Sequence, residues 1–182
     1  AEEGKQIVRE LQALPQVLAN VLEQKEIIAA AGAKYAEYRD AIFIGRKFHT
    51  PIAYEGALKL KEVAYTHAEG YAGGELKHGP IAMLDEQFPV IAIAPRDDVY
   101  EKMVSNIAEV KARKAPVLAL VSEGDTEVAT MVDDVIELPS VHPLLQPIVS
   151  TVPLHLLAYY IGVGKGYNVD RPRNLAKSVT VE

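Results

Sequence analysis

Short runs of apolar residues alternate with helical segments along most of this chain, and this alternation constrains its fold more than any other feature. The runs cover residues 41–44, 89–93, 116–121 and 134–138, and the first three are almost continuously apolar. Strands with that pattern are typical of parallel sheets that are buried on both faces. The alternation of strands and helices therefore predicts an α/β sandwich with right-handed crossovers.

Segments with a helical pattern precede, separate and follow these strands along the chain. Residues 4–40 carry apolar side chains at spacings of three and four, which predicts two N-terminal helices, with Pro15 bending or breaking the first. The glycine-rich stretch 69–80 and the polar tail 164–182 fit no regular element. The other helical segments are expected at 51–67, 98–114, 126–131 and 144–161.

The position of a ligand site follows from this topology. Ligands of open parallel sheets bind beyond the carboxyl ends of the strands. The loops that follow the four predicted strands are 45–51, 94–98, 122–126 and 139–144. We therefore expect a ligand crevice that these loops form together.

Composition excludes several classes of protein. The 182 residues are 49% hydrophobic, which suffices for the core of one domain, and the net charge of −6 with no dense basic stretch argues against nucleic acid. There is no cysteine, and the histidines lack metal-ligand spacing, so we expect no metal and no cofactor. The most apolar stretch, 148–164, is interrupted and short for a membrane span. We expect a cytoplasmic protein and, because the chain begins without Met, a processed chain or part of a longer one.

A polar stripe is expected on the helix at 51–67, whose start Thr50 and Pro51 predict. Glu55, Lys59 and Glu62 are spaced four and three apart, which places them on one face. Such a stripe is often a solvated face with an ion pair. Because the helix follows the first strand, its N-terminal half should face the crevice, where a carboxylate can serve as a proton-transfer base.

Two further segments carry candidate groups. The stretch 69–80 places His78 among glycines that suit an unusual backbone path, although a lone histidine in a loop is often only solvent-exposed. The tail carries two cations, Arg173 and Lys177, four residues apart among apolar anchors. It is either a frayed terminus or a docked segment that brings a phosphate-binding or carbonyl-reacting cation to a site.

Four segments together carry a resemblance to a known family: 55–62 (EGALKLKE), 67–69 (HAE), 74–80 (GELKHGP) and 173–182 (RNLAKSVTVE). The chain resembles the C-terminal part of the glutamine–fructose-6-phosphate aminotransferases (isomerizing), the glucosamine-6-phosphate synthases. These enzymes have a glutaminase domain followed by two SIS (sugar isomerase) subdomains.

The resemblance implies a three-layer αβα sandwich with a mainly parallel sheet, a flavodoxin-like SIS subdomain. It implies N-terminal helices over 1–40, the SIS subdomain over 41–163, and a tail over 164–182 that contributes to the active site. The implied partners are fructose 6-phosphate and glucosamine 6-phosphate, a second copy of the chain in a homodimer, and the glutaminase domain and first SIS subdomain of the parent chain.

The resemblance also implies roles for single residues. Glu62 matches the base that moves the proton between C1 and C2 of the sugar, Lys59 a neighbouring site lysine, and Glu55 a glutamate near the substrate. His78 matches a histidine that takes part in ring opening and reaches the site of the partner subunit. The tail matches a substrate-binding segment in which Lys177 forms a Schiff base with the C2 carbonyl, with Arg173 and Ala176 beside it.

Departures from the family pattern leave room for other functions. Lys47 replaces a usual glycine, His155 replaces a usual glutamine and is interpreted as a core-edge change, and the family's serine- and threonine-rich phosphate loop is missing. One alternative is a phosphosugar-binding regulatory module without catalysis, which would need neither Glu62 nor a lysine-bearing tail. A response-regulator-like domain is another, but basic residues stand where it would need acidic ones.

Overall fold

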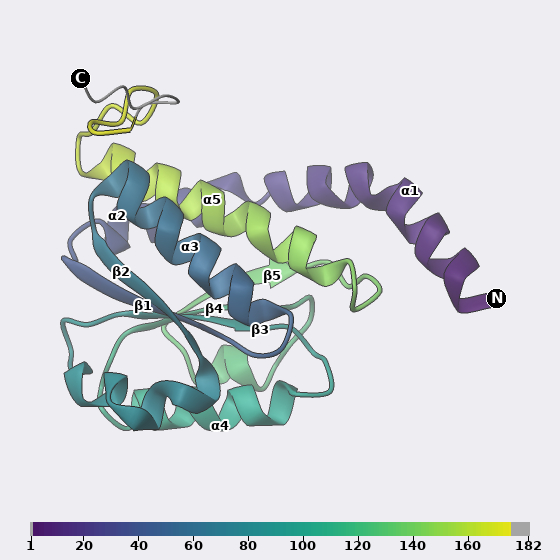
Figure 1. Ribbon diagram of the computed structural model, residues 1–182, viewed down its shortest axis with the longest axis horizontal. Helices are drawn as coiled ribbons and strands as arrows, with labels where there is room; N and C mark the ends of the chain where they lie inside the picture. Colours follow the sequence, from purple (N-terminus) through teal and green to yellow (C-terminus); the bar gives the residue numbers. More distant parts are fainter. Residues whose placement is uncertain (1, 176–182) are drawn as a thin grey trace, which may run out of the picture.

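The computed structural model describes residues 2–175 and places a five-stranded parallel sheet between two helical layers (Figure 1). The order across the sheet is β2-β1-β3-β4-β5, and each neighbouring pair is parallel. This order is the flavodoxin-like one, which confirms the predicted αβα sandwich. The strands are β1 (Asp40–Gly45), β2 (His67–Ala72), β3 (Val90–Ala94), β4 (Val117–Ser122) and β5 (Asp134–Leu138).

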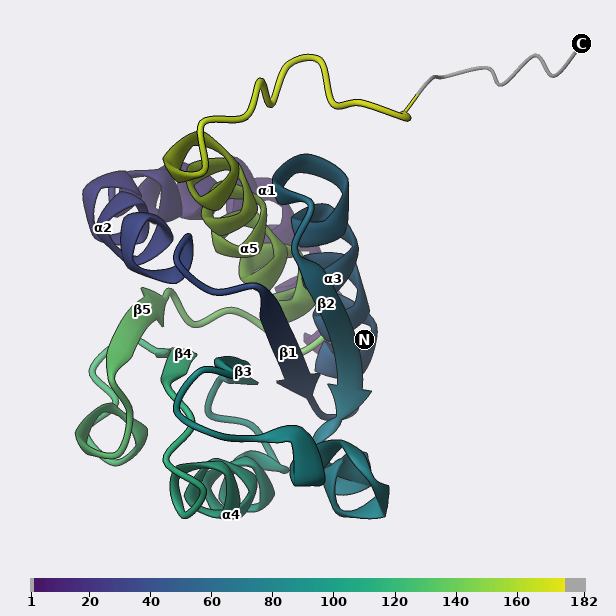
Figure 2. The ribbon, with the colours of Figure 1, turned by 90° about the vertical axis from the view of Figure 1, so that its left-hand side faces the viewer.

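Four α-helices lie on one side of the sheet, and one α-helix with three short 3-10 helices lies on the other (Figure 2). The first layer contains α1 (Glu2–Leu22), α2 (Lys25–Tyr35), α3 (His49–Ala64) and α5 (Gln146–Gly164). The second contains α4 (Tyr100–Lys111) and three 3-10 helices, η1 (Gly73–His78), η2 (Pro80–Met83) and η3 (Val128–Thr130).

The sheet divides the apolar core into two clusters. In β1, Phe43 faces the layer of α3 and α5, whereas Ile42 and Ile44 face the layer of α4, and all three side chains are buried. Residues of β3 and β4 alternate between the two clusters in the same way. The strands are therefore buried on both faces, as their continuous apolar sequence predicted.

Strand β2 is the element that the sequence prediction missed. It occupies an edge of the sheet and pairs only with β1, so most of its residues are partly exposed and its sequence, HAEGYA, lacks an apolar run. Gly70 within it lies so close to α3 that a Cβ atom would approach the Tyr54 ring to 2.5 Å. The prediction that the stretch 69–80 fits no regular element is therefore wrong, because it contains most of β2, all of η1 and the start of η2.

The prediction that Thr50 caps α3 is wrong, and of the two outcomes predicted for Pro15 the break is absent. The two predicted N-terminal helices are present, and helix α1 continues through Pro15, so the proline does not break it. Helix α3 begins at His49, so Thr50 lies inside the helix instead of capping it, and its hydroxyl donates to the carbonyl of Gly45 at 3.3 Å.

The expectation that the apolar stretch 148–164 is too short for a membrane span is wrong by length alone. Helix α5 has a length and hydropathy that would also suit a span, the single such helix among residues 2–175. In this fold it lies against α2 and α3 over the sheet, and nine of its residues are buried, among them Val149, Leu154 and Leu157. A core helix has the same properties, so its composition is weak evidence for a membrane.

Candidate functional site

The polar stripe on α3 exists as the sequence predicted. The Lys59 ammonium lies 2.5 Å from a carboxylate oxygen of Glu62 and 3.9 Å from one of Glu55. All three side chains are partly buried at the surface of the helix. The hydrogen bond to Glu62 raises the pKa of Lys59 against the opposing effect of burial. The stripe thus holds two carboxylates around one ammonium, an arrangement that can move a proton on a bound molecule.

His155 adds a fourth member to this stripe from the neighbouring helix α5. Its Nε2 atom lies 2.8 Å from Oε1 of Glu55, and its side chain is about half exposed. The interpretation of His155 as a core-edge change is therefore wrong, because the imidazole lies at the surface beside the stripe. Spacing along one helix could not show this contact, since the two residues belong to different helices.

The described part of the tail returns to the end of α3, three residues beyond Glu62. The backbone N–H of Arg173 donates to the Tyr65 hydroxyl at 2.7 Å, and its guanidinium lies 4.2 Å from the centre of the Tyr65 ring. Tyr65 itself ends the helix with a left-handed backbone conformation. Arg173 is thus placed at the C-terminal end of the helix that bears the stripe, whereas Ala176 and Lys177 lie outside the described residues.

His78 is not brought to the stripe within one chain. It is the last residue of η1, is exposed, and belongs to the layer of α4, on the opposite side of the sheet from α3. The adjacent Lys77 forms an ion pair with Glu109 of α4 at 2.7 Å. The structure therefore does not bring His78 and Glu62 together within one chain.

A separate cavity of about 270 Å³ lies at the carboxyl ends of the strands. The loops after β1, β3 and β5 and the last residue of β4, Ser122, contribute to its walls, which confirms a crevice at the strand ends predicted from the topology. Helix α3 contributes only its first residue, His49. The expectation that the stripe faces this crevice is wrong, because Glu55, Lys59 and Glu62 do not line it.

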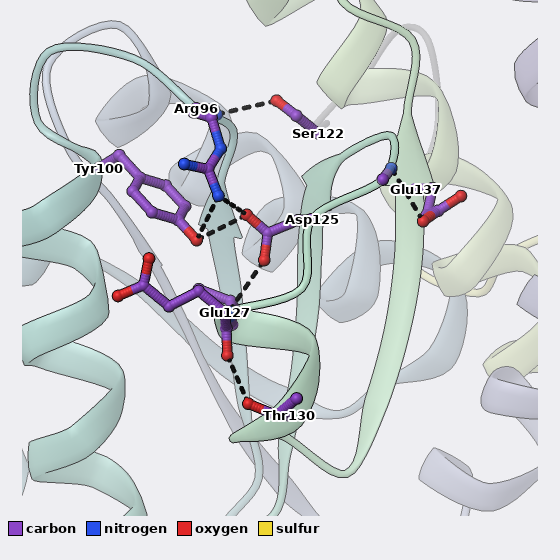
Figure 3. Close-up of polar contacts among 9 residues, drawn as sticks. Arg96, Tyr100, Ser122, Asp125, Glu127, Thr130 and Glu137 are labelled. Atoms are coloured by element: carbon purple, nitrogen blue, oxygen red, sulfur yellow. Dashed lines mark hydrogen bonds and ion pairs between the residues drawn. The ribbon is translucent and has the colours of Figure 1, made fainter.

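A buried carboxylate connects the loop after β3 to the loop after β4 through hydrogen bonds (Figure 3). The sequence analysis did not single it out. Asp125, whose side chain is fully buried, accepts hydrogen bonds from the Tyr100 hydroxyl at 2.6 Å, from Arg96 at 3.0 Å and from the Val128 N–H at 2.8 Å. Burial acts to raise the pKa of Asp125, but these hydrogen bonds outweigh it and lower the pKa below its usual value. A signal was present, since Asp is a common residue before a helical turn such as η3.

The strand order and the two helical layers define an α/β domain of flavodoxin-like form. The SIS domain family matches residues 34–163, and the chain belongs to this family. It is 54% identical over 181 residues to the glutamine–fructose-6-phosphate aminotransferase [isomerizing] of Thermus thermophilus, with all of this chain and 30% of that protein covered. The corresponding protein of Methanosarcina acetivorans is 52% identical over 178 residues, with 98% of this chain and 29% of that protein covered. The chain therefore spans about 30% of the length of these curated relatives.

Solved structures agree with this placement. The C-terminal domain of glucosamine-fructose-6-phosphate aminotransferase from Francisella tularensis superposes with a TM-score of 0.83 at 38% identity, covering 90% of this chain and 46% of that one. The sugar isomerase domain of an RpiR transcription factor from Sphaerobacter thermophilus has a TM-score of 0.70 at 20% identity, covering 86% and 91%. The second likeness shows the fold alone.

Proposed function

We propose that this chain forms part of the sugar-isomerising half of a glutamine–fructose-6-phosphate aminotransferase. The complete enzyme would convert fructose 6-phosphate and ammonia from glutamine into glucosamine 6-phosphate. The stripe on α3 is the observation that carries the proposal, because Lys59 holds Glu62 at 2.5 Å on the helix where the resemblance places the isomerisation base. The identity of 54% to an enzyme of that name supports it.

In the proposed mechanism, Glu62 carries one proton between neighbouring carbons. An imine at C2, formed with ammonia or with the Lys177 amine and releasing water, acidifies the proton on C1. Where Lys177 forms the imine, ammonia displaces its amine before this step. The Glu62 carboxylate removes the C1 proton, the electron pair of that C–H bond forms a C1–C2 double bond, and the C2–N π pair moves onto nitrogen. The carboxylic acid then returns the proton to C2 while the C1 hydroxyl gives up its proton and becomes the aldehyde carbonyl. Lys59 keeps the carboxylate oriented, and Glu55 holds the other side of the Lys59 ammonium.

The other roles in the proposed mechanism fall to residues outside α3: to His78, to the tail and to the other domains of the parent chain. His78 would assist ring opening in the site of a second copy of the chain, which fits its position on the far side of the sheet. Arg173 and Ala176 would flank Lys177 in the tail, and the contact of Arg173 with Tyr65 supports docking of the tail at this end of α3. The phosphate donors and the ammonia source would come from the first SIS subdomain and the glutaminase domain of the parent chain.

The surface around the stripe supports such an assembly. Exposed apolar side chains stand on the same two helices, Tyr54 and Leu58 on α3, and Ile148, Tyr159 and Val163 on α5. Apolar side chains gathered on one surface commonly mark a protein interface. We propose that the parent chain covers them, within a cytoplasmic homodimer.

The proposal is tested in a full-length enzyme whose C-terminal segment is this chain. Glu62→Gln keeps the shape of the side chain and removes its basicity, so proton exchange between C1 of the sugar and solvent should fall about 100-fold or more. The affinity for fructose 6-phosphate should remain close to normal. Glu101→Gln, at an exposed position of α4, is the matched control.

Near-normal exchange in Glu62→Gln would remove that residue from the mechanism. Sugar binding without exchange in the unmodified enzyme would favour the regulatory alternative. For the tail, borohydride should link the sugar covalently to Lys177, and the link should disappear in Lys177→Ala.

A further inference from the structure

His155 lies on α5, outside the helix that carries the proposed base, yet it contacts the stripe directly. We propose that His155 is a positioning residue of the isomerase site, which fixes Glu55 and, through Lys59, the orientation of the base. The inference rests on the proposed function, because it assigns a role within that same site. A positioning residue acts through another residue and does not itself touch the reacting atoms.

The hydrogen bond between His155 and Glu55 has a defined direction. The Nε2 atom of His155 lies 2.8 Å from the Oε1 atom of Glu55. An ionised carboxylate can only accept hydrogen bonds, so the imidazole donates and its Nε2 atom carries the hydrogen. Both the protonated imidazole and the neutral tautomer with hydrogen on Nε2 meet this requirement. What the contact needs from residue 155 is therefore an N–H donor.

One oxygen of Glu55 connects the histidine to the lysine of the stripe. The Oε1 atom that accepts from His155 also lies 3.9 Å from the Lys59 ammonium. The ammonium in turn donates to the Oε2 atom of Glu62 at 2.5 Å. A displacement of the Glu55 oxygen therefore changes the attraction on Lys59, and with it the place that Lys59 gives to the Glu62 carboxylate.

A residue on a second helix restricts Glu55 in a way that α3 alone cannot. Glu55 and Lys59 are four residues apart on one helix, where such pairs are weak and both long side chains keep much of their rotamer freedom. His155 belongs to α5, which packs along α3, and the donor of its short, planar side chain has fewer positions open to it. Fixed geometry is valuable for a base that serves two neighbouring carbons, since small displacements of reacting groups slow a reaction strongly.

Apolar side chains lie beside this contact on both helices. Leu58, one turn along α3 from Glu55, is 42% exposed, and Tyr159, one turn along α5 from His155, is 44% exposed. Both belong to the surface that we propose the parent chain covers. Exclusion of water from that surface would strengthen a hydrogen bond to a carboxylate. The role of His155 is therefore measured in the full-length enzyme.

The test uses a full-length enzyme whose C-terminal segment is this chain, with proton exchange at C1 of the sugar as the readout. His155→Ala should lower the maximal exchange rate about fivefold and leave the KM for fructose 6-phosphate within about twofold of normal. His155→Gln keeps an N–H donor and should restore the rate to within about twofold of normal. His67→Ala is the matched control and should leave the rate unchanged, because His67 is an exposed histidine whose ion pairs are with Asp40 and Glu69.

A second measurement separates positioning from a general structural effect. If His155 acts through Glu55, the double variant of His155→Ala and Glu55→Ala should be as slow as Glu55→Ala alone. The side chain of His155 is 47% exposed, so the circular dichroism spectrum of His155→Ala should match that of the unmodified enzyme. An independent structural effect would instead slow Glu55→Ala further.

A normal exchange rate in His155→Ala would overturn the inference, as would a rate in His155→Gln as low as in His155→Ala. An equal effect of His155→Ala with and without Glu55 would also overturn it. A raised KM at an unchanged maximal rate would make His155 a substrate contact and not a positioning residue. Glu62→Gln distinguishes these failures from failure of the proposed function. If Glu62→Gln loses exchange and His155→Ala does not, only the role of His155 is wrong, whereas near-normal exchange in Glu62→Gln would overturn both.

Discussion

The Nε2 atom of His155 on α5 lies 2.8 Å from the Oε1 atom of Glu55 on α3. The same Glu55 oxygen lies 3.9 Å from the Lys59 ammonium, which in turn lies 2.5 Å from a carboxylate oxygen of Glu62. The two helices are thus linked by a polar chain in the order His155, Glu55, Lys59, Glu62. In the proposed enzyme, His155 would hold Glu55 in place, and Glu55 would in turn hold the side of the Lys59 ammonium that faces away from the base.

The coupling between His155 and Glu55 can be measured by a double-mutant cycle on the free energy of unfolding. Because both side chains are partly exposed, water screens their interaction, and we expect a coupling of about 0.2–1 kcal/mol that decreases at high salt. His155→Ala, Glu55→Ala and the double variant are unfolded with urea. A parallel cycle with His155→Ala and Lys61→Ala serves as the control and should be additive. If the cycle of His155 and Glu55 is as additive as the control cycle, the contact does not contribute to the free energy of unfolding.

Asp125 should contribute more to stability than any exposed ion pair. Its carboxylate is fully buried and accepts three hydrogen bonds, so Asp125→Asn should lower the free energy of unfolding by about 2–4 kcal/mol at pH 7. The surrounding donors lower the pKa of Asp125 in the folded state below its ordinary value of 3.8. Its stabilising effect is therefore complete above about pH 4 and is lost as the pH falls through the lower folded value.

The measurement for Asp125 is urea unfolding of both proteins between pH 7 and pH 3. The difference in the free energy of unfolding between the unmodified chain and Asp125→Asn should become smaller toward pH 3. Asp170→Asn, at an exposed position of the tail, is the matched control. A difference that stays constant with pH would show that the carboxylate charge is not the stabilising feature.

His49 should also make the free energy of unfolding depend on pH, in this case because burial disfavours its protonated form. Burial lowers its pKa in the folded state below the ordinary value of 6.5, so the unfolded chain binds a proton more readily than the folded chain. Stability should therefore fall as the pH decreases below about 6.5, by at most about 1.4 kcal/mol per pH unit for this one group, until the folded histidine is also protonated.

His49→Gln removes the titrating group and should flatten the unfolding profile between pH 7 and pH 5. Asp97→Asn removes the charge that favours protonated His49, so the fall in stability should continue to lower pH. An equal slope in the unmodified chain and in His49→Gln would assign the pH dependence to other histidines.

The sequence allowed the prediction of features that depend on periodicity. The apolar runs of β1, β3 and β4 are specific because burial on both faces demands them, and the spacing of Glu55, Lys59 and Glu62 fixes a common helix face. The position of the cavity followed from the predicted carboxyl ends of the strands. Each of these signals lies within one element or follows from the order of elements.

Features that depend on contacts between distant elements could not be predicted in this way. Strand β2 lies at an edge, where half-exposed residues carry no apolar signal. The contact of His155 with Glu55 depends on how α3 and α5 pack, and the docking of Arg173 depends on the path of the tail around Tyr65. Local pattern does not encode the relative position of two helices, so such contacts emerge only from the fold.

The final prediction concerns the chain of 182 residues by itself, which should bind fructose 6-phosphate weakly. Recognition of a phosphate dianion relies on free cations and preorganised amide or hydroxyl donors. Here Lys59 is paired with Glu62 and Arg96 with Asp125, and the sequence lacks a serine- and threonine-rich loop. Calorimetry should therefore show no saturation below about 10 mM, whereas a full-length enzyme that ends in this chain should bind at least about a hundredfold more tightly. Tight binding by the chain alone would mean that it holds a phosphate site of its own, and the proposed division of work between the two SIS subdomains would be wrong.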